Sequence, residues 1–338
     1  MDRHQIIRVA VALCAVLGAR TVIAQSAAPT ILNVDVESFV RYVEDVTDPS
    51  RFATSPAVTP AVVPRNFSSF IAIADIVAVN GQPARGTYLS RGKTVNLSSA
   101  PAAGAAIADT TRAGAVDTRF EIFSADGVTP IGTLVSVEFG GGPPPPGAPL
   151  AITQGNNGIV GGTGAFLGAR GSFGQAVTPT TVATRMASIV EDPANRRTNG
   201  GGRTRFVLQV IPAARPEILL ARDQPLISHA SDSKLVTTSN PASSGETLNV
   251  FVTGLGPTRP GVDPGQPFPS SPASIVNSPV QVTVNGTAAS VLGAVGVPGR
   301  VDTYQVQFRV PPGISAGAAV VQVTAAWIPG AAATLAVR

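Results

Sequence analysis

Several residue types that carry chemistry are scarce in this chain of 338 residues. It has one cysteine, Cys14, and two histidines, of which only His229 lies beyond residue 24. Zinc sites built from histidine and cysteine need several such ligands, so we predict no metal site of this kind. Charged residues make up 13% of the chain, and its two lysines and scattered arginines form no basic cluster. This distribution argues against a nucleic-acid partner.

A long apolar run is also missing, and the one short run lies at the N-terminus. Arg3 and Arg8 precede the apolar stretch 9–19, and the small residues up to Ala24 suit a signal peptidase. This order is typical of a Sec-type signal peptide, so we expect residues 1–24 to be removed on export. The run is about half of the roughly 20 residues that span a bilayer, so we expect no transmembrane segment after cleavage. The mature protein then keeps no cysteine, and we expect it to be secreted, periplasmic or on the cell surface.

The chain is rich in glycine (35 residues) and proline (30 residues), which favours short strands joined by turns. The clearest strand pattern is 70–79, which places Asp75 on the same face as Ile71, Ile73 and Val77. Asn80-Gly81 then predicts a tight hairpin turn into a second strand, 85–91. Further strands are predicted at 118–123, 131–139, 158–160, 165–173 and 203–211, and residues 34–46 form either a short helix or a strand. The even spacing predicts an all-β fold with a closed antiparallel sheet over residues 25–211.

A second pattern of short strands follows residues 212–245, which we interpret as a linker with a strand leading into the next domain. Strands are predicted at 247–252, 280–284, 288–292, 303–310, 319–325 and 332–337. Their spacing over residues 246–338 favours an immunoglobulin-like β-sandwich. Trp327, the only tryptophan, is interpreted as a packing residue.

One glycine-rich segment resembles a known signature. Residues 158–171, GIVGGTGAFLGARG, resemble the Gly-Gly-Thr-Gly-x-Phe-x-x-Ala-Arg-Gly motif of the dirigent and allene oxide cyclase barrels. The Ala-Asp-Ile-Val at 74–77 and the Gly-Thr-Tyr at 86–88 are also similar to that family. The motif residues are Gly161, Gly162, Thr163, Gly164, Arg170 and Gly171. The resemblance covers about 67–211 and implies an eight-stranded antiparallel β-barrel with a central cavity.

The C-terminal part, about 218–338, resembles the immunoglobulin-like domain common in secreted acidobacterial proteins of unknown function. The resemblance rests on the segments 241–246, 254–258, 284–286 and 304–311. It implies a bacterial source and an extracellular β-sandwich that acts as a spacer or docks on a cell-surface or extracellular partner. Plant relatives of the barrel form dimers or trimers, so a homo-oligomer is expected by analogy.

The motifs predict no cofactor, because the glycine-rich run lacks the spacing of a dinucleotide fingerprint and no helix pattern follows it. Asp75 is the remaining chemical candidate. If its strand face lines the cavity, desolvation would raise the pKa of Asp75 toward that of a working acid or base. Tyr88, Arg85 or Arg91 on the neighbouring strand would then be its partner. The competing interpretation is structural, with Asp75 paired to an arginine or to turn amides.

Two functional hypotheses follow. The favoured one is a binding protein whose barrel holds a small apolar ligand, with Ile71, Ile73 and Val77 lining the cavity. The alternative is a barrel enzyme or stereochemical guide that positions a reactive intermediate and uses Asp75 for proton transfer. An interior filled by side chains would instead favour a purely structural extracellular protein.

Overall fold

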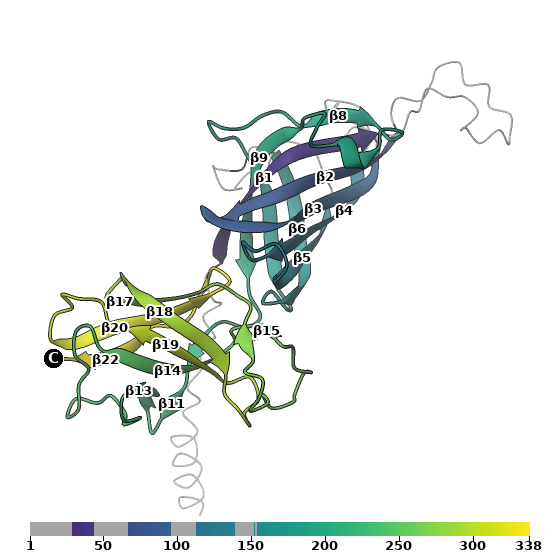
Figure 1. The fold of residues 1–338 in the computed structure, drawn as a ribbon. Coiled ribbons are helices and arrows are strands. Elements are labelled where there is room, and N and C mark those ends of the chain that lie inside the picture. The colour runs from purple at the N-terminus through teal and green to yellow at the C-terminus, as the bar shows by residue number, and fades with distance from the viewer. Residues whose placement is uncertain (1–28, 44–66, 96–112, 139–151, 153) are drawn as a thin grey trace, which may run out of the picture.

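The computed structural model describes residues 29–43, 67–95, 113–138, 152 and 154–338, so the predicted signal peptide 1–24 lies outside the described residues. Strands dominate this part of the chain, which forms two all-β units, a barrel and a second, curled sheet (Figure 1). No helix in the described ranges is long and apolar enough to cross a membrane.

The N-terminal unit is a closed barrel of eight antiparallel strands. Its order is β2-β3-β4-β5-β6-β7-β9-β1, and β1 returns to pair with β2. Closure leaves no unpaired barrel edge, which removes a template for aggregation. The barrel strands are β1 (Thr30–Val43), β2 (Phe67–Val79), β3 (Gln82–Val95), β4 (Ala113–Phe123), β5 (Pro130–Glu138), β6 (Gln154–Gly164), β7 (Arg170–Ala176) and β9 (Gly202–Ile211).

Strand β1 closes the barrel, although its sequence leaves helix and strand open. It is extended up to Val43, and residues 44–46 lie outside the described part. A bulge at Ser38, whose φ is +52°, turns Phe39 into the barrel and Val40 to the outside. Beyond the bulge, β8 (Arg185–Ser188) replaces β9 as the partner of β1 and pairs with it in parallel. Strand β8 therefore continues the barrel wall beside β1 in place of β9.

The predicted strand 165–173 begins later than expected. Residues 163–169 form a tight turn between β6 and β7, and the turn buries the Phe166 ring. Strand β7 then starts at Arg170. The prediction was wrong for the first five residues because backbone bonds from Phe166 to Thr163 and from Ala169 to Phe166 close the turn.

The barrel core has an aromatic centre. Five rings from β1, β3, β4, β7 and β9 pack with centroids 4.5–6.0 Å apart, mostly edge to face: Phe39, Tyr88, Phe120, Phe173 and Phe206. Aromatic pairs at these distances add about 0.5–1.5 kcal/mol each beyond their burial. The middle of the barrel is therefore filled by side chains.

The second unit is a curled antiparallel sheet with an aliphatic core. Its main order is β10-β14-β19-β18-β17-β20-β21, with β13, β15, β16 and β22 attached beside this path. Its longer strands are β14 (Thr247–Thr253), β17 (Val280–Val284), β18 (Thr287–Gly296), β19 (Tyr304–Arg309), β20 (Gly317–Ala325) and β22 (Ala333–Val337); its short ones are β10 (Glu217–Ile218), β13 (Ile227–His229), β15 (Thr258–Arg259), β16 (Ile275–Val276) and β21 (Ile328–Pro329). A separate small hairpin joins β11 (Leu220–Ala221) and β12 (Gln224–Pro225). Much of the expected linker 212–245 thus belongs to this unit, because β10 and β13 both pair with β14.

The turn between β20 and β21 joins the two units. Ala326 and Trp327 both have positive φ, and Trp327 is buried within the core cluster of the barrel. Its Nε1 donates a hydrogen bond to Gln82 Oε1 at the β2–β3 turn, 2.9 Å away. A second bond runs from Asn277 Nδ2 to the carbonyl oxygen of Pro130, at 3.0 Å. Trp327 is thus a packing residue, as predicted, and it packs beneath the barrel rather than in its own unit.

Candidate functional site

A ligand-lining role for Ile71, Ile73 and Val77 requires their face of β2 to point into the barrel. In the structure that face points outward. Up to the register shift after Ile76, the buried residues of β2 are Phe70, Ala72, Ala74 and Ile76, whereas Ile71 is exposed and Ile73 and Val77 are only half-buried. Beyond the shift, Val79 is buried as well. The three predicted lining residues therefore lie on the outer surface of the barrel. Both faces of this strand are apolar, so alternation identified the two faces without showing which one is inside.

Asp75 also lies on the outer face, in an ion-pair cluster. Its carboxylate accepts a hydrogen bond from Arg196 at 2.6 Å and two from Arg197 at 2.9 and 3.0 Å. The Asp75 side chain is 19% exposed and that of Arg196 is 10% exposed. Arg196 follows the short 3-10 helix η2 (Pro193–Asn195), so these bonds fasten the segment around η2 to the barrel wall. This arrangement matches the structural interpretation of Asp75.

The other catalytic candidates do not meet Asp75. Tyr88 points into the barrel and stacks on Phe206, with ring centroids 4.5 Å apart. Arg85 is exposed on β3, and Arg91 pairs with Asp117 at 3.0 Å on the surface. The structure therefore separates these residues between the inside and the outside of the barrel wall.

The glycine-rich motif shapes the turn after β6. A Cβ at Gly162 would lie 2.7 Å from the carbonyl oxygen of Thr133 on β5, so only glycine allows this approach. Gly164 has a φ of +60°, a conformation that glycine adopts at no steric cost. Thr163 bonds to Thr133 across the strands at 2.6 Å, and Arg170 donates to the carbonyl oxygens of Val160 and Ala169. Gly161 and Gly171 lie on β6 and β7. All these contacts hold strands together.

The interior changes character along the barrel. The end that faces the second unit holds the buried Phe166 and the Trp327 turn, and the aromatic centre lies above them. Toward the opposite end one level of the interior carries polar side chains, and beyond it Val116 and Phe70 are apolar again. The polar side chains at this level are Ser90, Thr118, Ser136, Asn157, Gln175 and Thr204. We call these six residues the polar ring. The sequence pattern of β4 indicates part of this ring, because Thr118 lies on the same face of the strand as Phe120 and Ile122.

Part of the polar ring is bonded within itself. Thr118 donates to Ser90 at 3.0 Å, and Gln175 donates to Thr204 at 2.9 Å. Two atoms of the ring, Ser136 Oγ and Asn157 Oδ1, are buried without a hydrogen-bond partner in the described part of the chain. A buried polar atom left in this way costs about 1–3 kcal/mol. In native structures such groups call for a specific explanation, and a bound molecule that supplies the missing hydrogen bond is one such explanation.

The outer end of the barrel adds one charged group. Arg41 lies on the inward side of β1, opposite Ala72, and its guanidinium carbon is 3.7 Å from the centre of the Phe70 ring. This cation–π contact positions the guanidinium beside the polar ring.

His229 has a structural position in the second unit. It is buried, with Nδ1 2.5 Å from Glu246 Oε1 and Nε2 3.3 Å from the carbonyl oxygen of Asn240. Both ring nitrogens thus face acceptors that belong to the framework of the sheet. Within the described ranges, no three His, Cys, Asp or Glu side chains group together in a way that could hold a metal ion.

The polar ring of the barrel is therefore the best candidate functional site, because it places two buried, unpartnered polar atoms beside the aromatic centre. Comparison with known proteins adds no further guide, since no protein family, curated protein or solved structure matches this chain.

Proposed function

We propose that this chain is an exported binding protein whose barrel holds a small, largely apolar molecule with a hydrogen-bonding head group. The head group bonds to the polar ring, and the apolar body lies against the aromatic centre. The observation that carries the proposal is the pair of buried, unpartnered atoms, Ser136 Oγ and Asn157 Oδ1. A hydroxyl group on the ligand would donate to either oxygen and relieve the desolvation penalty.

The sizes of the inward side chains support a ligand at this level of the barrel. The central level is occupied by large rings such as Phe120 and Phe206, whose centroids lie 5.4 Å apart. At the polar ring the inward residues include Ser90, Thr118 and Ser136, beside Ala72 on β2. Eight-stranded barrels either fill their interior with side chains or hold one small ligand, and small side chains favour the second outcome.

The proposal also assigns each of the two units to a family. We propose a barrel of the dirigent and allene oxide cyclase type, supported by the closed eight-stranded topology and by the glycine motif at its β6–β7 turn. The second unit would be an immunoglobulin-like docking module of an exported protein, supported by its antiparallel strands and valine-rich core. Its Trp327 turn would also close one end of the binding barrel.

Native mass spectrometry of the exported chain, incubated with an extract of small molecules from the host, tests the proposal. Ser136→Ala removes the unpartnered hydroxyl, so it is expected to abolish or sharply weaken ligand retention while leaving the fold intact or slightly more stable. Ser274→Ala is the matched control, because Ser274 Oγ is also buried and unpartnered but lies in the second unit. The control should retain the ligand.

The outcomes separate the remaining hypotheses. An apolar compound that is retained by the parent chain and by Ser274→Ala, and lost from Ser136→Ala, supports the proposal. A compound that only the parent chain alters chemically would support the enzyme hypothesis instead. The absence of any retained compound would overturn the proposal and favour a purely structural extracellular protein.

A further inference from the structure

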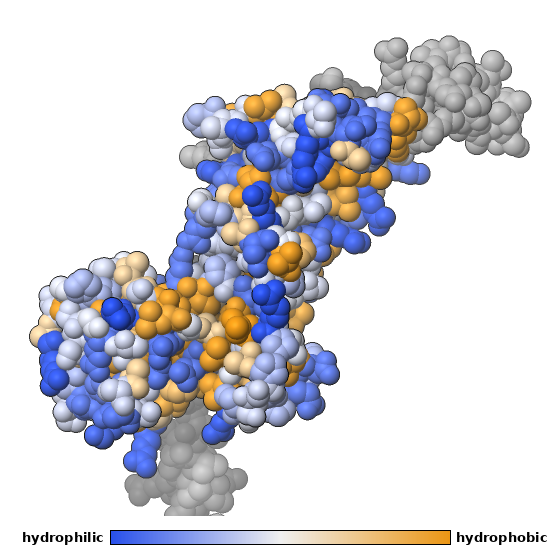
Figure 2. All heavy atoms as spheres, viewed as in Figure 1, coloured by the Kyte–Doolittle hydropathy of each residue, from blue (hydrophilic) through white to orange (hydrophobic). Residues whose placement is uncertain are grey.

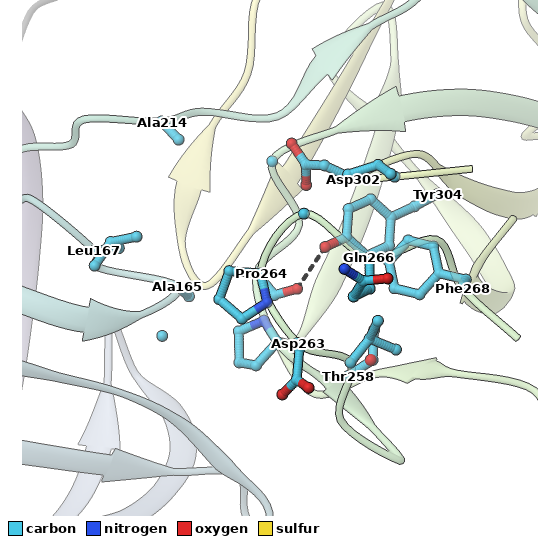
Figure 3. Close-up of a pocket in the computed structure, with 17 residues that line it drawn as sticks. Ala165, Leu167, Ala214, Thr258, Asp263, Pro264, Gln266, Phe268, Asp302 and Tyr304 are labelled. Carbon is cyan, nitrogen blue, oxygen red and sulfur yellow. Dashed lines mark hydrogen bonds between the residues drawn. The ribbon is translucent and has the colours of Figure 1, made fainter. Parts of the chain in front are cut away.

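A cavity lies where the two units meet, away from the interior of the barrel. It has a volume of about 350 Å³, within the range of small-molecule sites. Its walls come from the β6–β7 turn of the barrel and from loops of the second unit around residues 254–268 and 301–304. Figure 3 shows Ala165 and Leu167 on one side and Phe268 and Tyr304 on the other.

The walls of this junction cavity are mostly apolar. Leu167 is 70% exposed, Val301 is 49% exposed, and Phe268 is buried against Tyr304 with ring centroids 5.1 Å apart. Figure 2 shows apolar surface on the second unit close to its junction with the barrel. A large side chain such as Leu167, left in water beside a cavity, provides apolar surface that a ligand can cover.

The charged side chains that line the cavity are both acidic. Asp263 and Asp302 extend from two different loops, and neither forms an ion pair with any residue in the described part of the chain (Figure 3). The Tyr304 hydroxyl is already engaged, since it donates to the carbonyl oxygen of Gly256 at 2.7 Å. Burial, followed by the neighbouring Asp302, raises the pKa of Tyr304, so its ring stays neutral. The cavity therefore offers apolar walls with two negative charges.

We propose that the junction cavity binds a small organic cation, an apolar body that carries one ammonium or guanidinium group. The apolar body covers Leu167, Val301 and the exposed apolar surface beside them. The ammonium or guanidinium group bonds to Asp302 or Asp263. An anion of the same shape is rejected, because both carboxylates repel it. This site is separate from the polar ring and does not depend on the function proposed for the barrel.

The backbone makes a clean test available. Asp302 has a φ of +43°, and asparagine is among the few residues that tolerate this conformation, so Asp302→Asn removes the charge without adding strain. Asp223 provides a matched control, since it is exposed, has a φ of +66° and lies in the β11–β12 turn away from the cavity. Asp263→Asn completes the charge removal. Thermal unfolding of each variant verifies that its fold is unchanged.

The probes are 2-phenylethylammonium and 3-phenylpropanoate, which have similar size and opposite charge. Titration is followed by NMR of the methyl groups of Leu167, Val262 and Val301. We expect saturable shifts with the ammonium probe, about tenfold weaker binding in the Asp263→Asn/Asp302→Asn double variant, and unchanged binding in Asp223→Asn. Binding should weaken further as salt is added.

Three results would overturn the proposal. One is the absence of saturable shifts with the ammonium probe. Another is equal affinity for the carboxylate probe, which would show that the site is merely apolar. The third is unchanged affinity in the double variant, which would place the cation elsewhere.

Discussion

The two units bury their apolar residues in different ways. The barrel closes on itself through β1 and fills its centre with five aromatic rings. The second unit is a curled sheet whose core is mostly valine and leucine, and it contributes Trp327 to the core of its neighbour. A closed barrel must fill a cylinder, which large rings do well, whereas a sheet folded on itself needs only two interdigitating layers. The stability of the barrel therefore depends on closure between distant strands and on packing against the second unit.

The largest expected effect tests that dependence. Trp327→Ala should destabilise the barrel by about 3 kcal/mol or more, because it leaves a cavity under a packed core and removes the bond to Gln82. Hydrogen–deuterium exchange should show lower protection in β2 and β3. Leu335→Ala, in the core of the second unit, is the control and should leave the barrel protected. Unchanged barrel protection in Trp327→Ala would mean that the two units are independent.

The second prediction compares the two cores directly. Phe120 contacts three rings, whereas the equally buried Phe308 belongs to the largely aliphatic core of the second unit. Phe120→Leu should therefore cost about 1–2 kcal/mol more than Phe308→Leu, because it also removes edge-to-face contacts. Exchange protection of each unit measures the two losses. Equal losses would show that the rings contribute only their buried area.

The third prediction concerns the outer wall of the barrel. Asp75→Asn should destabilise the segment around β8 by about 2 kcal/mol, because Arg196 is left buried without its carboxylate. Asp117→Asn should cost less than about 0.5 kcal/mol, since the Arg91–Asp117 pair is exposed to solvent. Hydrogen–deuterium exchange in residues 185–203 measures the difference in local stability between the two variants. If the barrel holds a ligand as proposed, ligand retention should survive both substitutions, and its loss in Asp75→Asn would favour a chemical role for this residue.

The smallest expected effect is a loss of stability of the second unit at acidic pH. Burial alone would raise the pKa of Glu246, but hydrogen bonds from His229 and from the Ser243 amide outweigh it and hold the pKa below the ordinary 4.5. A depressed carboxyl pKa contributes stability above the unfolded value and loses it as the pH falls through the folded value. Exchange protection near His229 should therefore decline below about pH 4.5.

Glu246→Gln should lower that protection by about 1 kcal/mol at neutral pH and flatten the acid dependence. Glu217→Gln is the control, since Glu217 is exposed on β10. If the acid dependence were to persist in Glu246→Gln, another carboxyl group would be its source.

Much of the strand pattern could be predicted from the sequence, but the face of each strand that points into the core could not. The Asn80-Gly81 turn is present, and it joins β2 to β3 in register from Val79↔Gln82. Alternation separated Asp75 from Ala74 correctly, but both faces of β2 are apolar, so the inward face was not identifiable. The small alanines face inward because bulky rings from β3 and β4 fill the space opposite them. The polar ring was missed for a different reason, since its members come from six different strands.

The all-β class, most strands and the tight turns follow from local patterns in the chain, because they depend on alternation and on residues a few positions apart. Long-range packing instead makes β1 close the barrel, places Trp327 beneath it, and brings Arg196 to Asp75, 121 positions away in the chain. The same packing brings the β6–β7 turn and the loops of the second unit together around the junction cavity. Such contacts join residues far apart in the chain, and their free energy depends on packing that no local pattern encodes.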